Sequence, residues 1–148
     1  MDRTEKAVEL FKSGYNCSQA VVGAYADFFG VDTQTALKMS EGFGGGIGRM
    51  RLTCGAVSGM AIVCGLKYSN AEAGDIQTRT KIYETVRCMA KEFEDKNGSI
   101  ECGVLLGVNK PADNSAKPEE RTSEYYKKRP CAECVRDCAQ IIEKYLMG

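Results

Sequence analysis

Residues 42–68 read GFGGGIGRMRLTCGAVSGMAIVCGLKY, a glycine loop followed by an apolar segment. The loop holds five glycines in seven residues, and two arginines lie between it and Cys54, where the apolar segment begins. From Cys54 to Tyr68 the residues are apolar nearly all round a helix, which is typical of a helix buried on every side. We therefore predict a central, most buried helix over this segment, with Thr53 as its N-cap.

Apolar residues recur at helical spacing on both sides of this segment. No period-2 alternation predicts a strand, and residues 107–121, which contain two prolines, form the one long polar loop. The fold class that we predict is all-α, a single-domain helical bundle of six or seven helices over residues 1–148. The other expected helices cover residues 4–12, residues 17–30 after a cap at Asn16, residues 33–40 after a cap at Asp32, residues 72–96, a short stretch after a cap at Ser99, and a last stretch with Pro130 in its first turn.

Charge and hydropathy exclude several classes of partner. The chain has 20 basic and 20 acidic residues, so neither nucleic acid nor an anionic membrane surface is expected as the main partner. The N-terminus is charged from its second residue and lacks the apolar core of a signal peptide. The longest apolar stretch, residues 56–66, is too short to span a bilayer. We expect a cytoplasmic protein without membrane insertion.

The chain contains eight cysteines and no histidine. Histidine is the usual partner of a nucleophilic cysteine and a common metal ligand, so its absence excludes Cys–His catalysis, mixed Cys–His zinc fingers and an imidazole general base. In a reducing compartment, a cysteine-rich chain of this kind is more typical of redox, metal-binding or buried thiols than of a disulfide framework.

Four cysteines stand in the first turn of an expected helix: Cys17, Cys54, Cys102 and Cys131. Free backbone N–H groups and the positive end of the helix dipole stabilise a thiolate at this position and lower its pKa. Arg49 and Arg51 precede Cys54, so we expect Cys54 to be the attacking thiolate. These four residues are the candidate catalytic residues.

The other four cysteines are less informative. Cys64 and Cys138 lie on apolar faces, where a cysteine is usually a small, inert core residue. Cys88 lies off the apolar stripe of its helix and is expected to face a second helix layer or a subunit contact. Cys134 forms a Cys-x-x-Cys motif with Cys131 at a helix start, as in dithiol oxidoreductases, but no βαβ pattern surrounds it.

The glycine loop fits neither common nucleotide motif. Its glycines do not have the G-x-G-x-x-G spacing, a helix rather than a strand precedes it, and no Gly-Lys-Ser/Thr follows. Three interpretations stay open: an anion held by the loop, a turn that requires positive φ and close packing, and a close backbone approach that brings Cys54 to other thiols or to a small bound group. We favour the third. The candidate binding residues of the loop are Gly44, Gly45, Gly46, Arg49 and Arg51.

The pattern resembles a family of bacterial and archaeal proteins of about this length that is named for its cysteines, C_GCAxxG_C_C, and described as redox-active. The resemblance implies four functional cysteines, which correspond to Cys17, Cys54, Cys102 and Cys131. It also implies, for some members, an association with transporter genes, and it gives no substrate. The residues that carry it are Gly14–Ala20, the glycine loop, Cys54–Gly59, Ser99–Cys102, Leu105–Gly107, Cys131, Val135, Asp137 and Ala139.

These residues support three hypotheses of function. The first is a redox protein in which two of the four helix-start thiols form a reversible disulfide, with no cofactor and a redox partner that the sequence does not identify. The second is a zinc or iron–sulfur site with Cys17, Cys54, Cys102 and Cys131 as metal ligands. The third is a non-enzymatic helical binding or sensor module, compatible with a homodimer and with the transporter association, whose cysteines mostly fill the core.

Overall fold

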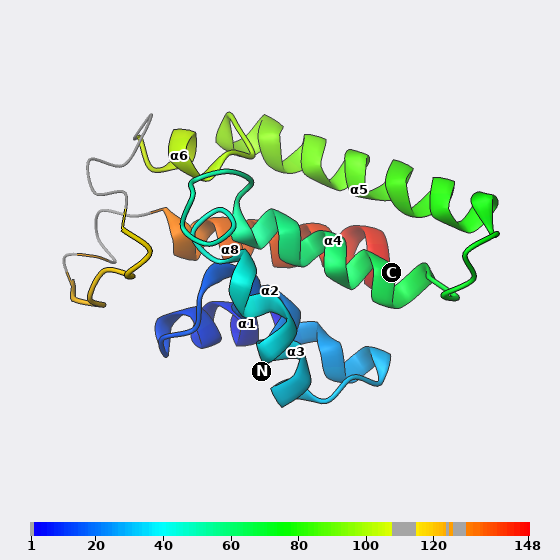
Figure 1. Cartoon of the computed structure of the whole chain (residues 1–148), viewed down its shortest axis with the longest axis horizontal. Coiled ribbons are helices and arrows are strands. Elements are labelled where there is room, and N and C mark those ends of the chain that lie inside the picture. The colour runs from blue at the N-terminus through cyan, green and yellow to red at the C-terminus, as the bar shows by residue number, and fades with distance from the viewer. Residues whose placement is uncertain (1, 108–114, 124, 126–129) are drawn as a thin grey trace.

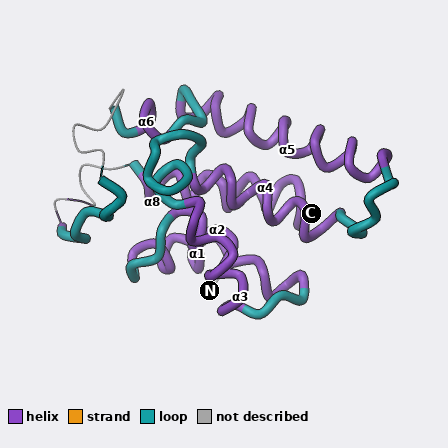
Figure 2. The backbone as a smooth tube through the Cα atoms, viewed as in Figure 1, coloured by secondary structure: helices purple, strands orange, loops and turns teal. Residues whose placement is uncertain are grey.

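The computed structural model describes residues 2–107, 115–123, 125 and 130–148. These residues form seven α-helices and no strand, so the predicted all-α bundle is confirmed. In Figure 2 the helices lie close to one another and are joined by loops. The α-helices are α1 (Arg3–Lys12), α2 (Cys17–Tyr25), α3 (Thr33–Ser40), α4 (Gly55–Tyr68), α5 (Ile76–Asn97), α6 (Cys102–Leu105) and α8 (Cys131–Ile142). Shorter turns are the 3₁₀ helices η1 (Ala26–Phe29) and η2 (Glu41–Phe43) and the terminal π-helical turn η3 (Glu143–Met147).

Two of the predicted helix caps are confirmed. The Asn16 side chain accepts from the Gln19 N–H at 3.0 Å while Gln19 reaches back to the Asn16 N–H at 3.0 Å, which makes a capping box at the start of α2. Asp32 caps α3 by accepting from the Thr35 N–H.

Two other predicted caps are wrong. Cys54, not Thr53, is the N-cap residue of α4, because the backbone of Thr53 pairs with Glu101 instead. Glu101, not Ser99, is the N-cap residue of α6. The Ser99 hydroxyl accepts from the Glu101 N–H, which precedes the helix, rather than from an N–H group in its first turn. The long helix also begins later than expected, at Ile76, after Asp75 caps it.

The helix buried over most of its length is α2 rather than α4, which corrects the sequence prediction. All residues of α2 from Ser18 to Tyr25 are buried, because α1, α3, α4 and α8 all pack against it. α4 buries only the part of its surface that faces α2, α5 and α8. The apolar composition of α4 therefore exceeds what its packing covers.

Figure 1 shows α5 along one side of the molecule, α4 and α8 in the middle, and α1 to α3 on the other side. The main core lies between these layers and includes Phe11, Tyr25, Met60, Phe93 and Ile142, each at most 2 % exposed. The starts of α4, α6 and α8 and the glycine loop lie at the same end of the molecule (Figure 1). This end carries the candidate site.

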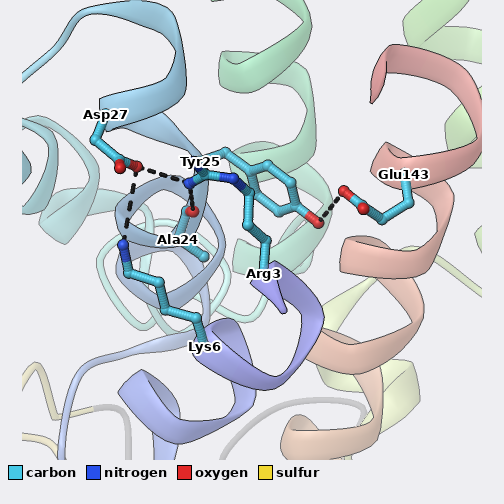
Figure 3. A network of polar contacts seen from close by, with 6 residues as sticks. All are labelled: Arg3, Lys6, Ala24, Tyr25, Asp27 and Glu143. Carbon is cyan, nitrogen blue, oxygen red and sulfur yellow. Dashed lines mark hydrogen bonds and ion pairs between the residues drawn. The ribbon is translucent and has the colours of Figure 1, made fainter. Parts of the chain in front are cut away.

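A polar network at Tyr25 fixes α1, α2 and α8 relative to one another (Figure 3). The buried Tyr25 hydroxyl lies 3.0 Å from Glu143 Oε2 and 3.1 Å from the Ala139 carbonyl oxygen. Arg3 donates to the Ala24 carbonyl and to Asp27, both at 2.8 Å. Burial, followed by the nearby Glu143 carboxylate, raises the pKa of Tyr25, so the hydroxyl stays protonated and able to donate.

None of the described helices is long and apolar enough to cross a membrane. Residues 108–114 of the predicted loop, which was expected over residues 107–121, lie outside the described residues. Pro130 precedes the last helix as its N-cap residue rather than lying in its first turn.

Candidate functional site

All four predicted cysteines lie at helix starts. Cys17, Cys102 and Cys131 are the first residues of α2, α6 and α8, and Cys54 is the N-cap residue of α4. The four side chains line one cavity of about 60 Å³, together with a fifth cysteine, Cys134, one turn into α8. The N-termini of four helices that are separate in the sequence therefore meet at this cavity, which we call the thiol cavity.

Two glycines of α4 allow its start to approach the start of α2. A β-carbon at Gly55 would lie 3.0 Å from the Phe43 carbonyl oxygen and 3.5 Å from the Cys17 Cβ. A β-carbon at Gly59, four residues on and on the same face, would lie 3.1 Å from the Val21 Cβ. At Gly55 the Ser18 amide nitrogen of α2 would lie 3.3 Å from the added β-carbon, so both positions face α2 more closely than a side chain readily allows. The Cys-Gly-Ala-x-x-Gly motif therefore brings Cys54 next to Cys17.

A short antiparallel bridge places Cys54 beside Cys102. Thr53 pairs with Glu101, the Cys54 N–H donates to the Ile100 carbonyl at 2.7 Å, and the Cys102 N–H donates to the Leu52 carbonyl at 2.6 Å. Because these bonds fix the register of the two segments, α4 and α6 begin side by side. A single bridged pair gives no period-2 pattern, so the sequence offered no signal for it.

The glycine loop is a left-handed turn that packs on Cys102. Residues 45–49 all have positive φ, between 55° and 73°, and Ile47 and Arg49 are among them. A β-branched residue with positive φ is strained, and such strain is held only by surrounding structure. At Gly46 a β-carbon would lie 2.7 Å from the Cys102 Cβ. The predicted need for positive φ and close packing is confirmed, with Cys102 as the residue approached.

Cys54 differs from Cys17, Cys102 and Cys134 in that its thiolate is favoured. A hydrogen bond from the Cys134 thiol lowers the pKa of Cys54, and the backbone N–H groups of Val57 and Ala56 in the first turn of α4 lower it further. Burial raises the pKa of Cys54, since its side chain is only 5 % exposed, but the three donors outweigh that effect. A helix start alone does not produce this shift; the partner thiol is its largest cause.

Three other cavity thiols, those of Cys17, Cys102 and Cys134, favour the protonated form. A hydrogen bond with Cys131, then burial, raises the pKa of Cys17 well above its usual value. The hydrogen bond to Cys54 and then burial raise the pKa of Cys134 strongly, because Cys134 donates to the Cys54 thiolate. Burial raises the pKa of Cys102. The prediction that every helix-start thiol has a lowered pKa is therefore wrong for Cys17 and Cys102.

The two arginines act on other groups than the sequence indicated. Arg51 Nη1 lies 3.6 Å from the sulfur of Cys102, where the guanidinium partly offsets the effect of burial on the pKa of that thiol. Arg49 turns away and donates to the Ser115 carbonyl at 2.6 Å, with Glu119 at 3.6 Å. No arginine is among the main causes of the lowered pKa of Cys54.

The remaining cysteines divide as follows. Cys64 and Cys138 are fully buried and their pKa values are raised, which confirms them as core residues. The charge of the Cys54 thiolate contributes to the raised pKa of Cys138. Cys88 is exposed on α5 and faces no second helix layer within the described residues. Sequence reasoning left Cys134 undecided, and the Cys-x-x-Cys spacing at a helix start was the signal that could have selected it.

A metal-binding arrangement was also predicted for the four helix-start cysteines. Within the part of the chain that the structure describes, no group of three or more Cys, Asp or Glu side chains is placed to hold one ion. None of the described cysteines forms a disulfide.

A family model described as "Putative redox-active protein (C_GCAxxG_C_C)" matches residues 15–145. The chain belongs to this family. All eight cysteines lie within the matched range, and the central motif reads Cys-Gly-Ala-x-x-Gly at residues 54–59. No curated protein and no solved structure matches the chain significantly.

Proposed function

We propose that this protein is a thiol–disulfide redox protein whose working dithiol is Cys54 and Cys134. The observation that carries the proposal is that Cys54 and Cys134 line the same cavity, where their interaction lowers the pKa of Cys54 and raises that of Cys134. An attacking thiolate beside a protonated resolving thiol is the arrangement that dithiol exchange requires. Membership in a family described as redox-active supports the same function.

The reaction proceeds in two exchanges. The Cys54 thiolate attacks one sulfur of a substrate disulfide, forms a mixed disulfide, and releases the other half as a thiolate. Cys134 then loses its proton to the released thiolate and attacks the Cys54 sulfur, which forms the Cys54–Cys134 disulfide and releases the second half of the substrate. The protein dithiol is oxidised by two electrons, and the substrate disulfide is reduced to two thiols.

The raised pKa of Cys134 fits its role as the second nucleophile, which must stay protonated until the mixed disulfide has formed. The thiol is held protonated by its hydrogen bond to Cys54, by burial and by repulsion from the Cys54 charge. The bond and the repulsion both disappear once Cys54 is bound in a mixed disulfide, because that sulfur then carries no charge. Cys134 therefore becomes easier to ionise when it is needed as the second nucleophile.

Cys17 and Cys131 form a second hydrogen-bonded pair in the same cavity. Both are more exposed than Cys54 and Cys134. Its hydrogen bond with Cys131 and its burial raise the pKa of Cys17, so Cys17 corresponds to Cys134 as the protonated member of its pair.

The test is disulfide mapping after equilibration in dithiothreitol redox buffers, which carry no charge. Free thiols are alkylated at each buffer ratio, and peptides are identified by mass spectrometry. We expect the first disulfide to join Cys54 to Cys134. With a linear disulfide such as dithiodipyridine, which has no second thiol to resolve the adduct, the Cys134→Ser variant should stop at a mixed disulfide on Cys54. Cys54→Ser should lose the fast reaction, whereas Cys88→Ser, at an exposed site on α5, should react like the parent protein. Thiols that all stay reduced, or a first disulfide without Cys54, would overturn the proposal.

The two alternative hypotheses, a metal site and a non-enzymatic binding module, can be tested on the same protein when it is purified without oxygen. Stoichiometric zinc, or iron with a visible absorption band, would favour the metal site over the dithiol. Loss of stability without any loss of specific thiol reactivity in the Cys54→Ser and Cys134→Ser variants would favour a binding module. Under our proposal, the protein is metal-free and colourless and has eight titratable thiols after reduction.

A further inference from the structure

A second cavity of about 300 Å³ adjoins the thiol cavity. Three arginines and two glutamates line it, so it carries a net positive charge. The residues that bound both cavities are Asn16, Gly45, Arg51, Arg121 and Tyr125.

Arg51 is held at the boundary between the two cavities with unused donor capacity. Its backbone adopts a φ of 63°, in the left-handed region, and Nη1 reaches the sulfur of Cys102. Its Nε is buried and has no hydrogen-bond partner among the described residues. A buried, unsatisfied guanidinium nitrogen is costly, and such a group calls for an explanation such as a ligand.

The other two arginines of the second cavity are engaged by the protein. Arg49 lies 3.6 Å from the Glu119 carboxylate. Arg121 donates to the Phe11 and Tyr15 carbonyls and lies over the rings of Phe11 and Tyr125. Arg51 makes no ion pair among the described residues. Its charge is the one that a bound anion would neutralise.

The backbone of the glycine loop offers little to an anion. The N–H groups of residues 47–52 all donate to carbonyls within the loop, for example Arg49 to Gly44 at 3.1 Å and Leu52 to Gly46 at 2.9 Å. Among residues 44–52, only Gly45 and Gly46 keep backbone N–H groups that an anion could use, so side chains must supply most of its contacts. This modifies the cradle of backbone amides considered from the sequence.

We infer that the substrate of the dithiol is a small disulfide with a carboxylate or a similar anionic group, and that Arg51 binds this group. This inference rests on the proposed function. The anionic group occupies the larger cavity against the Arg51 guanidinium, and the disulfide extends past Arg51 into the thiol cavity toward Cys54. The chemistry at sulfur is the two-step exchange described above.

The experiment compares two disulfide probes on the full-length reduced protein: dithiobis(nitrobenzoate), which carries two carboxylates, and dithiodipyridine, which is neutral at the same pH. Second-order rates of reaction at Cys54 are measured by stopped flow for the parent protein, Arg51→Gln and Arg51→Lys. We expect Arg51→Gln to slow the anionic probe about tenfold or more and the neutral probe less than about twofold, because a charged hydrogen bond is lost with only one of them. Arg51→Lys should retain part of the preference, and added salt should slow the anionic probe only where residue 51 is cationic.

Three controls separate this effect from other causes. Arg87→Gln removes the same charge from an exposed position on α5, so it should leave both rates unchanged. The same series in a Cys102→Ser background removes the thiol that Arg51 contacts, and the anionic preference should persist. Thermal unfolding shows whether each variant is folded.

Equal slowing of both probes by Arg51→Gln, or no slowing of either, would overturn the inference. If the neutral probe still produces the Cys54–Cys134 disulfide, the proposed function survives such a result. Failure of both probes to react at Cys54 in the parent protein would instead defeat the proposed function itself.

Discussion

Gly55 at the start of α4 stands directly against Cys17 at the start of α2, so that a β-carbon on Gly55 would lie 3.5 Å from the Cys17 Cβ. The Phe43 carbonyl oxygen and the Ser18 amide nitrogen would be nearer still, at 3.0 Å and 3.3 Å. These are backbone atoms of neighbouring segments and cannot rotate away. The contact joins two of the helix starts that form the thiol cavity.

The Gly55→Ala variant should be destabilised by about 1–3 kcal/mol, because the added methyl group overpacks the contact between α2 and α4. It should also speed alkylation of the buried Cys54, since the two helix starts must separate and expose it. Urea unfolding and iodoacetamide kinetics measure the two effects. Gly65→Ala is the matched control on the same helix: nothing lies within 4 Å of its added β-carbon, so the variant should gain about 0.5–1 kcal/mol from helix propensity. Equal stability of the two variants would contradict the close contact.

The Gly46→Ala variant should be more damaging than Gly48→Ala. Both positions have positive φ, 73° and 55°, so each alanine costs about 1–2 kcal/mol in backbone strain. Only at Gly46 does the β-carbon also meet Cys102 and the Leu52 amide, at 2.7 Å and 2.6 Å. We expect Gly46→Ala to unfold at a clearly lower urea concentration and to expose Cys102 to alkylation. Cys102 that stays protected in Gly46→Ala would show that the loop does not hold it.

The Asn16→Ala variant should lose about 1–2 kcal/mol of stability and change thiol reactivity. Asn16 caps α2 and also donates to the Glu41 carbonyl at 2.9 Å, so it ties the start of Cys17's helix to the segment before the glycine loop. Asp32→Ala removes a comparable cap from α3, whose start does not line the thiol cavity. It should lower the unfolding midpoint and leave the alkylation rate of Cys17 unchanged. Similar alkylation rates in the two variants would contradict a role for Asn16 at the site.

The reduced protein should lose stability as the pH rises from about 8 to about 10. Five thiols have a raised pKa in the folded state, so they stay protonated while the unfolded chain begins to ionise near pH 8.5: Cys17, Cys64, Cys102, Cys134 and Cys138. The unfolded state then binds fewer protons, and each such thiol lowers the free energy of unfolding by about 1.4 kcal/mol per pH unit. The lowered pKa of Cys54 acts in the opposite direction, but it is one group against five.

Urea unfolding under a non-thiol reductant at several pH values measures this dependence. Cys138→Ala removes one of the five thiols with a raised pKa and should make the decline with pH less steep, apart from any change in stability at neutral pH. Cys88→Ala, at an exposed position, should leave the decline unchanged. A free energy of unfolding that is constant or rises over this range would contradict the raised thiol pKa values.

Much of the site could be predicted because its signals are local. A helix start depends on a capping residue and a few apolar positions, so Asn16 and Asp32 were found with the helices that they begin. The placement of four cysteines at helix starts followed from those boundaries. Their clustering agrees with the family pattern, which the family match supports over residues 15–145.

Other parts of the site depend on contacts between residues far apart in the chain. Cys134 meets Cys54 across 80 positions, and the pKa of each thiol depends mainly on the other. Arg51 precedes Cys54 by three residues but contacts Cys102, because the left-handed loop and the Thr53–Glu101 bridge turn its side chain that way. Proximity in the sequence therefore predicted Cys54 as the thiol beside Arg51, whereas the thiol that Arg51 contacts is Cys102.

The sequence by itself determined the all-α class, the helix starts and the cysteines that stand there, since hydrophobic periodicity and capping act within a few residues. Tertiary structure decided which thiols meet, which of them favours the thiolate, and where the arginines lie. The physical reason is that a buried thiol's pKa follows its hydrogen-bond partner and its desolvation, and both arise only when helices from distant parts of the chain pack together.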